Sequence, residues 1–364
     1  MRMLLWFIIA AVFSVSSISA QADGIHQTIK LVPFPSTLVP GPVMVESQGV
    51  VYGLAEDFTK NAKPNVGNSV FRISKEGALT FQCTNRQVGL GGNIVFDRQG
   101  NGYTLTVGGV LRFSPKGDCR IIAGFGPDLD IATINGELTI SPSETLFGST
   151  RTGKLFFVDF AHGTTRTFAN LPFPPNAPNA FLTDIAADPE HEGTLGGTFL
   201  WVTTDESVKS QLFTYKLFGG YKNVFLFSEN VYMTSVSFVS HDRFVASSIQ
   251  TGYLLSSSGR VLSDKVSAQD FPIALKDDHL FYAYEVTTVI PTNPPSRFPV
   301  IRVNLYIGRS RLDGSDQQNV ADISAFGMPI GAVLPGSHGK YYVAMSPSSG
   351  PFNILIASSG DARD

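Results

Sequence analysis

The sequence is short of charged residues, and this shortage narrows the class of protein. Lys, Arg, Asp and Glu make up 16% of its 364 residues, against about 25% in ordinary soluble domains. The formal net charge is only −3, so neither a nucleic acid nor an anionic membrane surface is an expected partner. No long run shows the helical period of about 3.6 residues between capping residues, which argues against a helical fold.

Long apolar runs are also missing, except at the N-terminus. Arg2 is followed by the apolar run Leu4–Val15 and by Ala20-Gln21-Ala22, which resemble the three parts of a signal peptide. A membrane anchor is the alternative, but the run is shorter than the roughly 20 residues that span a bilayer. We therefore expect residues 1–22 to be a signal peptide, residues 23–364 to form one domain, and the mature protein to be secreted.

Cysteine is scarce as well, with only Cys83 and Cys119 in the chain. Export into an oxidising compartment favours a disulfide between them. Closing that loop would stabilise the fold by roughly 3–4 kcal/mol on the chain-entropy estimate. Two buried free thiols are the alternative, and the sequence does not decide between them.

What the chain has in abundance is a short repeated pattern, seen most clearly in Gly91–Gly124. Four strands are predicted there, namely Asn93–Asp97, Tyr103–Val107, Val110–Ser114 and Cys119–Ala123. The turns between them contain glycine, which supplies the positive φ that tight hairpins need. Apolar and polar residues tend to alternate within each strand, as half-buried antiparallel strands require. The unit is a four-stranded meander that cannot bury both of its faces alone.

The same pattern recurs along the whole chain at intervals of roughly 50 residues, a repeat length typical of propeller blades. The first strands of the copies begin at Pro42, Asn93, Glu137, Asp184, Ser235, Pro272 and Pro329. The last copy lacks a fourth strand, which residues 26–34 (HQTIKLVPF) can supply. That pairing would close the ring and remove exposed sheet edges. The sequence therefore predicts an all-β, seven-bladed β-propeller, with six blades as the alternative.

The connections of such a ring fall on two faces. Turns between first and second strands, and between third and fourth, form what we call the short-turn face. The remaining connectors form the long-loop face, and they include residues 58–67, 84–92, 124–135, 171–182 and 287–302. Long loops on a rigid scaffold commonly carry function, although they can also be tolerated insertions.

Histidine placement bears on the chemistry of these faces. Five histidines fall in turns of the short-turn face, and His26 lies on the closing strand. Without a histidine at the long-loop face, Ser-His or Cys-His nucleophilic catalysis is disfavoured there. We interpret the histidines as turn residues rather than ligands.

The first-strand starts of four successive blades are the candidate site. Asn93, Glu137, Asp184 and Ser235 are expected to point toward the ring axis. Two carboxylates and an amide fit Ca²⁺ or Mg²⁺, and Glu137 with Asp184 could instead share a proton or bind a ligand. A solvated lining of polar residues is the remaining alternative.

Apolar and cationic residues are expected around these four first-strand positions. Arg86 and Arg151 are candidate catalytic residues that could polarise a carbonyl group. The candidate ligand-binding residues of the rim are Phe173, Phe181, Tyr232 and Phe298. A proline-rich apolar rim fits a small apolar substrate and limits the entropy lost on binding, but ordinary packing between blades would use the same residues.

The blade pattern, as in residues 93–106, 110–117, 182–189 and 197–207, resembles the gluconolactonase, strictosidine-synthase and Yellow/royal-jelly propellers. In gluconolactonase-like proteins, carboxylates and amides from separate blades hold a divalent metal. That resemblance implies Asn93, Glu137 and Asp184 as metal ligands and lactonase activity.

The chain also looks like fungal secreted propellers that close rings in secondary-metabolite pathways, including hetero-Diels–Alderases, in size, export signal and aromatic content. This second resemblance implies cyclisation without a metal or a histidine base. Three functions thus remain open: a cyclase or lyase that needs no cofactor, a metal-assisted lactonase, and a non-catalytic binding propeller.

Overall fold

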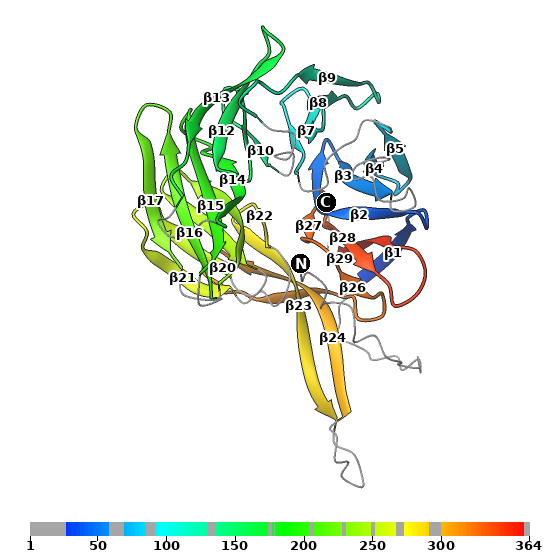
Figure 1. Cartoon of the computed structure of the whole chain (residues 1–364). Helices are drawn as coiled ribbons and strands as arrows, with labels where there is room; N and C mark the ends of the chain where they lie inside the picture. Colours follow the sequence, from blue (N-terminus) through cyan, green and yellow to red (C-terminus); the bar gives the residue numbers. More distant parts are fainter. Residues whose placement is uncertain are drawn as a thin grey trace.

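The computed structural model describes the chain over most of its length (Figure 1). The described residues are 27–57, 69–84, 92–129, 136–173, 177, 179–203, 207–227, 231–248, 252–266, 273–290 and 300–359. All secondary structure within them is β, in seven antiparallel sheets arranged as a ring. The prediction of a seven-bladed β-propeller is confirmed, and the six-bladed alternative is wrong. The described part of the chain contains no helix of the length and apolar character needed to cross a bilayer.

Blades 1 to 4 are regular meanders in which each strand pairs with the next along the chain. Blade 1 consists of β2 (Leu38–Ser47), β3 (Val50–Asp57), β4 (Ser69–Ile73) and β5 (Leu79–Gln82). Blade 2 consists of β6 (Val95–Phe96), β7 (Gly102–Thr106), β8 (Gly109–Phe113) and β9 (Cys119–Ala123). Blade 3 consists of β10 (Leu138–Ile140), β11 (Leu146–Ser149), β12 (Lys154–Asp159) and β13 (Thr164–Asn170). Blade 4 consists of β14 (Phe181–Ala187), β15 (Thr194–Val202), β16 (Val208–Lys216) and β17 (Gly220–Leu226).

Blades 5 and 6 continue the ring, and blade 7 closes it. Blade 5 consists of β18 (Met233–Ser240), β19 (Arg243–Ser248), β20 (Gly252–Ser256) and β21 (Val261–Val266). Blade 6 consists of β22 (Ala274–Lys276), β23 (His279–Ile290), β24 (Val300–Arg311) and β25 (Gln318–Asp322). Blade 7 consists of β26 (Met328–Pro329), β27 (Leu334–Pro335), β28 (Lys340–Ser346), β29 (Asn353–Ser359) and β1 (Gln27–Pro33).

Closure of the ring uses the N-terminal strand. β1 pairs antiparallel with β29 over its whole length, from Gln27 opposite Ser359 to Pro33 opposite Asn353. In Figure 1 the blue start of the described chain accordingly lies beside its red end. The expected role of the N-terminal segment as the missing strand is confirmed.

The hydrophobic core is divided among the seven interfaces between neighbouring blades. Seven buried clusters occur in the described residues, and each draws its members from two adjacent blades. Between blades 3 and 4, for example, Leu155 packs with Phe199 and Phe213. Because every sheet buries both faces against neighbours, the strands read as apolar and rich in Phe.

A glycine in the second strand makes room for a phenylalanine in the third strand of blades 1 to 4. A Cβ on Gly197 would lie 2.4 Å from the Phe213 ring, and one on Gly102 would lie 2.1 Å from the Phe113 ring. The equivalent pairs in blades 1 and 3 are Gly53 with Phe71 and Gly148 with Phe156. These glycines therefore serve close packing, whereas the turn glycine Gly100, with φ of 80°, serves the hairpin bend.

Two local features differ from the sequence-based expectations. Residues 287–302 were expected to be a loop, but β23 and β24 pair as far as Ile290 opposite Val300. The hairpin consequently projects from the ring as a long ribbon (Figure 1). The first strand of blade 7 is broken into β26 and β27, where Gly331 approaches the Pro42 carbonyl so closely that no Cβ would fit.

Cys83 and Cys119 form a disulfide, with their Cα atoms 5.5 Å apart. Cys83 follows the outer strand of blade 1, and Cys119 begins the outer strand of blade 2. The bridge therefore joins neighbouring blades, and the alternative of two free thiols is wrong.

Candidate functional site

The four residues expected at the strand starts lie at the innermost strands of successive blades. Asn93 lies two residues before β6 and Glu137 immediately precedes β10, while Asp184 lies in β14 and Ser235 in β18. The side chains of Asn93 and Asp184 each form a hydrogen bond to the following blade. The repeat register read from the sequence thus places all four in equivalent positions.

Asp184 bridges blades 4 and 5 through its carboxylate. One oxygen accepts the backbone N–H of Ile185 at 2.8 Å, and the other accepts that of Val236 on β18, also at 2.8 Å. Burial raises the pKa of Asp184 to about 7, although both backbone N–H groups favour its charged form. Burial is the dominant effect, so this carboxyl group titrates near neutral pH.

Glu137 has a pKa well above its usual range for two reasons. Burial disfavours its charge, and the nearby Asp184 carboxylate disfavours it further. The Arg151 guanidinium and the backbone N–H of Asn93 act in the opposite direction. Because the two carboxyl groups titrate together, they form a pair that retains a proton close to neutral pH.

Asn93 and Ser235 are engaged with protein neighbours. The Asn93 side-chain amide donates to the Leu138 carbonyl and accepts the Leu138 N–H, both at 2.8 Å. It therefore links blades 2 and 3 as Asp184 links blades 4 and 5. The Ser235 hydroxyl lies 2.5 Å from that of Ser247 on the neighbouring strand.

Arg151 and two phenylalanines surround the connection between blades 3 and 4. The Arg151 guanidinium carbon lies 5.4 Å from the centre of the Phe181 ring, a cation–π distance. The Leu182 N–H donates to the Arg151 carbonyl at 2.9 Å, which ties the two segments together. Phe173 packs edge-on against Phe199 with ring centres 5.3 Å apart.

The other predicted rim residues are not all described. Tyr232 is 37% exposed and directly precedes the buried Met233. Arg86 and Phe298 lie outside the described residues, as do residues 1–22. Their proposed roles stay predictions.

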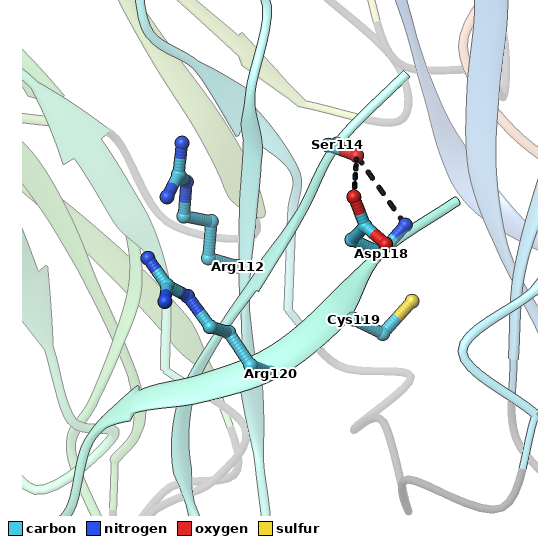
Figure 2. Close-up of a pocket in the computed structure, with 5 residues that line it drawn as sticks. All are labelled: Arg112, Ser114, Asp118, Cys119 and Arg120. Carbon is cyan, nitrogen blue, oxygen red and sulfur yellow. Dashed lines mark hydrogen bonds between the residues drawn. The ribbon is translucent and has the colours of Figure 1, made fainter. Parts of the chain in front are cut away.

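A pocket of about 470 Å³ lies elsewhere, on the outer strands of blade 2 (Figure 2). Arg112 on β8 and Arg120 on β9 stand opposite each other in register and line it with Ser114, Asp118 and Cys119. Of the residues singled out from the sequence, it contains only the disulfide cysteine Cys119. Its outer position separates it from the carboxyl pair on the inner strands.

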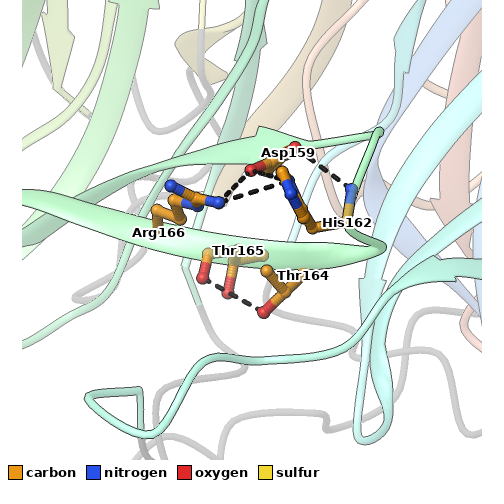
Figure 3. A network of polar contacts seen from close by, with 5 residues as sticks. All are labelled: Asp159, His162, Thr164, Thr165 and Arg166. Atoms are coloured by element: carbon orange, nitrogen blue, oxygen red, sulfur yellow. Dashed lines mark hydrogen bonds and ion pairs between the residues drawn. The ribbon is translucent and has the colours of Figure 1, made fainter.

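Four of the five histidines expected in short turns lie there, whereas His279 begins β23, and His26 lies outside the described residues. The interpretation of the histidines as turn residues rather than ligands stays a prediction. His191 and His241, from the first turns of blades 4 and 5, both approach Asp188. Asp188 and His241 occupy first turns of consecutive blades, so comparison of these turns would have been the signal for finding the cluster. His162 forms a separate contact with Asp159 and Arg166 in blade 3 (Figure 3).

Comparison with known proteins yields similarity of fold alone. No protein-family model and no curated protein sequence matches the chain. A streptogramin B lyase structure is 12% identical with a TM-score of 0.57, covering 92% of this chain and 98% of the other. A catalytically inactive virginiamycin B lyase from Staphylococcus aureus, with quinupristin, is 11% identical with a TM-score of 0.50, covering 92% and 99%.

A structure described as a gluconolactonase is also similar, at 12% identity and a TM-score of 0.45, covering 92% of this chain and 93% of the other. The two lyase structures show that this chain shares the β-propeller fold. The chain is a seven-bladed β-propeller whose fold is similar to that of streptogramin B lyase.

Proposed function

We propose that this protein is an enzyme that moves a proton within a small apolar molecule and so opens or closes a ring. The observation that carries the proposal is the pair Glu137 and Asp184, which lies at the innermost strands of blades 3 and 4 and retains a proton near neutral pH. A general acid and a general base work best when their pKa values lie near the working pH. Few surface carboxyl groups meet that condition.

The chemistry that fits one shared proton is elimination and its reverse. The charged member of the pair removes a proton from a carbon next to the bond that breaks. The electrons of that C–H bond form a C=C bond, and the departing oxygen or nitrogen takes the proton of the neutral member. No water or cofactor is consumed, and the product has the mass of the substrate. Run in reverse, the same steps close a ring.

Residues around the pair support binding of such a substrate. The Arg151 guanidinium, which already influences Glu137, is suited to polarise a substrate carbonyl. Phe181, held under that guanidinium, and Phe173 offer apolar surface. The substrate is therefore proposed to be small, largely apolar and to carry a carbonyl group. A pericyclic ring closure in secondary metabolism would draw on the same orientation without proton transfer.

A metal-assisted lactonase is the second candidate, because Asn93, Glu137 and Asp184 offer oxygen donors from successive blades. Those oxygens suit Ca²⁺ or Mg²⁺. However, the Asn93 oxygen and both Asp184 oxygens already accept backbone N–H groups. Each of these oxygens therefore has one fewer lone pair for a metal, so we place this candidate second.

The compartment proposed for this activity is oxidising. The Cys83–Cys119 disulfide is the supporting observation, since such bonds persist mainly outside reducing cytosol. Together with the signal peptide expected at residues 1–22, it fits a secreted protein.

The test is turnover of a panel of lactones and other ring compounds, together with their open unsaturated forms. Lyase or cyclase activity gives a product of unchanged mass, whereas lactone hydrolysis adds one water. Glu137→Gln and Asp184→Asn should each abolish turnover, while Asp264→Asn, on an exposed outer strand, should not. Hydrolysis that chelation removes and Ca²⁺ or Mg²⁺ restores would favour the lactonase instead. Tight binding of panel compounds without turnover would indicate a non-catalytic binding propeller.

A further inference from the structure

A second group of ionisable side chains meets on the short-turn face, between blades 4 and 5. Asp188 and His191 lie in the turn between β14 and β15, and His241 lies in the turn between β18 and β19. The Asp188 Oδ2 atom is 2.5 Å from His241 Nδ1 and 3.5 Å from His191 Nδ1. One potential metal-ligand atom from each residue lies within 4.8 Å of the others. It is the one group of three or more such residues found in the described part of the chain.

The two carboxylate oxygens of Asp188 have different partners, and one of them faces the two histidines. Its side chain is completely buried. Oδ1 accepts the backbone N–H groups of Glu190 at 2.8 Å and His191 at 3.1 Å. Oδ2 faces both imidazoles. Such outer hydrogen bonds are what fixes a ligating carboxylate in place.

The two imidazole rings lie close together beside the Asp188 carboxylate. Their ring centres are 3.6 Å apart, with the planes inclined by 39°. Two imidazoles bound to one tetrahedral ion have ring centres about 5 Å apart, so these rings must separate as the ion enters. The side chains of His191 and His241 are 53% and 36% exposed, so an ion can enter and keep a water ligand.

We propose that Asp188, His191 and His241 bind a first-row transition-metal dication, with Zn²⁺ the expected ion, and that water completes its coordination. Two nitrogen donors and one carboxylate oxygen suit Zn²⁺ and disfavour Ca²⁺ or Mg²⁺. Bonds of about 2.1 Å in a tetrahedron place neighbouring ligand atoms roughly 3.4 Å apart, close to the 3.5 Å between His191 Nδ1 and Asp188 Oδ2. The shorter His241 contact must open by about 1 Å as the metal replaces the proton between those atoms.

The metal would join the same two strands that Asp184 joins. β14 carries Asp184, Asp188 directly follows its last residue, and its neighbour across the blade interface is β18. Asp184 reaches the Val236 N–H of β18, while Asp188 reaches His241 just beyond the end of that strand. The site would therefore hold blades 4 and 5 together on the face opposite the long loops, separately from the proposed catalysis.

A matched control exists one blade earlier. His162 Nδ1 lies 2.8 Å from Asp159 Oδ2, in a turn with the same three-residue spacing as Asp188 and His191. There the second partner is the Arg166 guanidinium, 2.7 Å from the same oxygen (Figure 3). A permanent cation already satisfies that carboxylate, so the Asp159 cluster should not bind metal.

The experiment titrates the chelator-treated full-length protein with two metals. Calorimetry measures Zn²⁺ binding, and the visible absorption spectrum measures Co²⁺ binding. We expect one equivalent of either metal in the wild type and a tetrahedral Co²⁺ spectrum. His241→Ala and Asp188→Asn should weaken binding at least 100-fold. His191→Gln should do the same and remain folded, because it changes an exposed side chain. His162→Ala should bind as the wild type does.

Each outcome bears on the proposal. Wild-type protein that binds no stoichiometric Zn²⁺, or folded His191→Gln and His241→Ala variants that bind it unchanged, would overturn the site. Glu137→Gln should retain Zn²⁺ binding, so failure of the proposed enzymatic function and failure of this metal site are distinguishable.

Discussion

Two aspartates of blade 4, Asp184 within β14 and Asp188 just after it, have different partners. Asp184 stands near another carboxyl group, Glu137, and burial raises its pKa to about 7. Asp188, four positions further on, is fully buried but faces two imidazoles and two backbone N–H groups. A carboxyl neighbour favours holding a proton, whereas imidazole neighbours favour holding a cation. The chemical character of these two aspartates therefore depends on the neighbours that surround each of them, several of which come from the adjoining blades.

The largest expected effect is a difference in enzymatic activity between variants of the carboxyl pair and variants of the Asp188 cluster. Glu137→Gln removes one proton carrier, so turnover of a ring-opening or ring-closing substrate should fall by about 10²–10⁴-fold. Asp188→Asn should leave the turnover of the folded protein within about tenfold, because the metal site contacts no substrate. Steady-state kinetics of both variants checks this. Equal losses of turnover in both variants would mean that the carboxyl pair and the Asp188 cluster do not act separately.

The disulfide provides a covalent counterpart to these polar links between blades. The double variant Cys83→Ser/Cys119→Ser removes the bridge between blades 1 and 2, and unfolding should become easier by roughly 3–4 kcal/mol. Urea denaturation measures the change. A loss near zero would show that packing between those blades is sufficient without the bridge.

A pH dependence of stability distinguishes the carboxyl pair. The folded pKa of Asp184 is raised from 3.8 to about 7, so between those values the folded protein binds more protons than the unfolded chain. Stability should therefore be greatest below about pH 4 for this group and should fall as the pH rises toward 7. In Asp184→Asn this part of the decline should disappear, as thermal melts at several pH values would reveal. Asp264→Asn, which removes an exposed carboxyl group, should retain it.

The smallest expected effect comes from Arg151. Arg151→Gln removes the cation that favours the charged form of Glu137 and the contact with Phe181. Stability should change by only about 0.5–1 kcal/mol, while the pKa of Glu137 should rise further. The acidic limb of the pH–rate profile should accordingly move to higher pH. Arg151→Lys keeps the charge and should show a smaller displacement.

Much of the ring follows from local sequence patterns. β9 spans Cys119–Ala123 as predicted, and the closing strand was identifiable because the last repeat lacked a partner. Turn glycines such as Gly100 were also readable. The strand glycines Gly102 and Gly197 were not, because their role depends on a phenylalanine in the neighbouring strand.

The site was only partly predictable for the same reason. The repeat register brought Glu137 and Asp184 into equivalent positions, but the size and direction of their pKa changes depend on burial within the assembled ring. The Asp188 cluster joins turns about 50 residues apart and carries no local motif. The extension of β23 and β24 was missed because the proline-rich sequence around it reads as a loop.

The most direct test of the central claim is a pH titration of the carboxyl groups by ¹³C NMR on protein labelled at Asp and Glu side chains. We predict a carboxyl resonance with an apparent pKa near 7, to which burial raises Asp184, and this titration should disappear in Asp184→Asn and change in Glu137→Gln. If instead every carboxyl group titrates below about pH 5, the range of ordinary Asp and Glu, the pair holds no proton at neutral pH. The proposed acid–base function would then be contradicted.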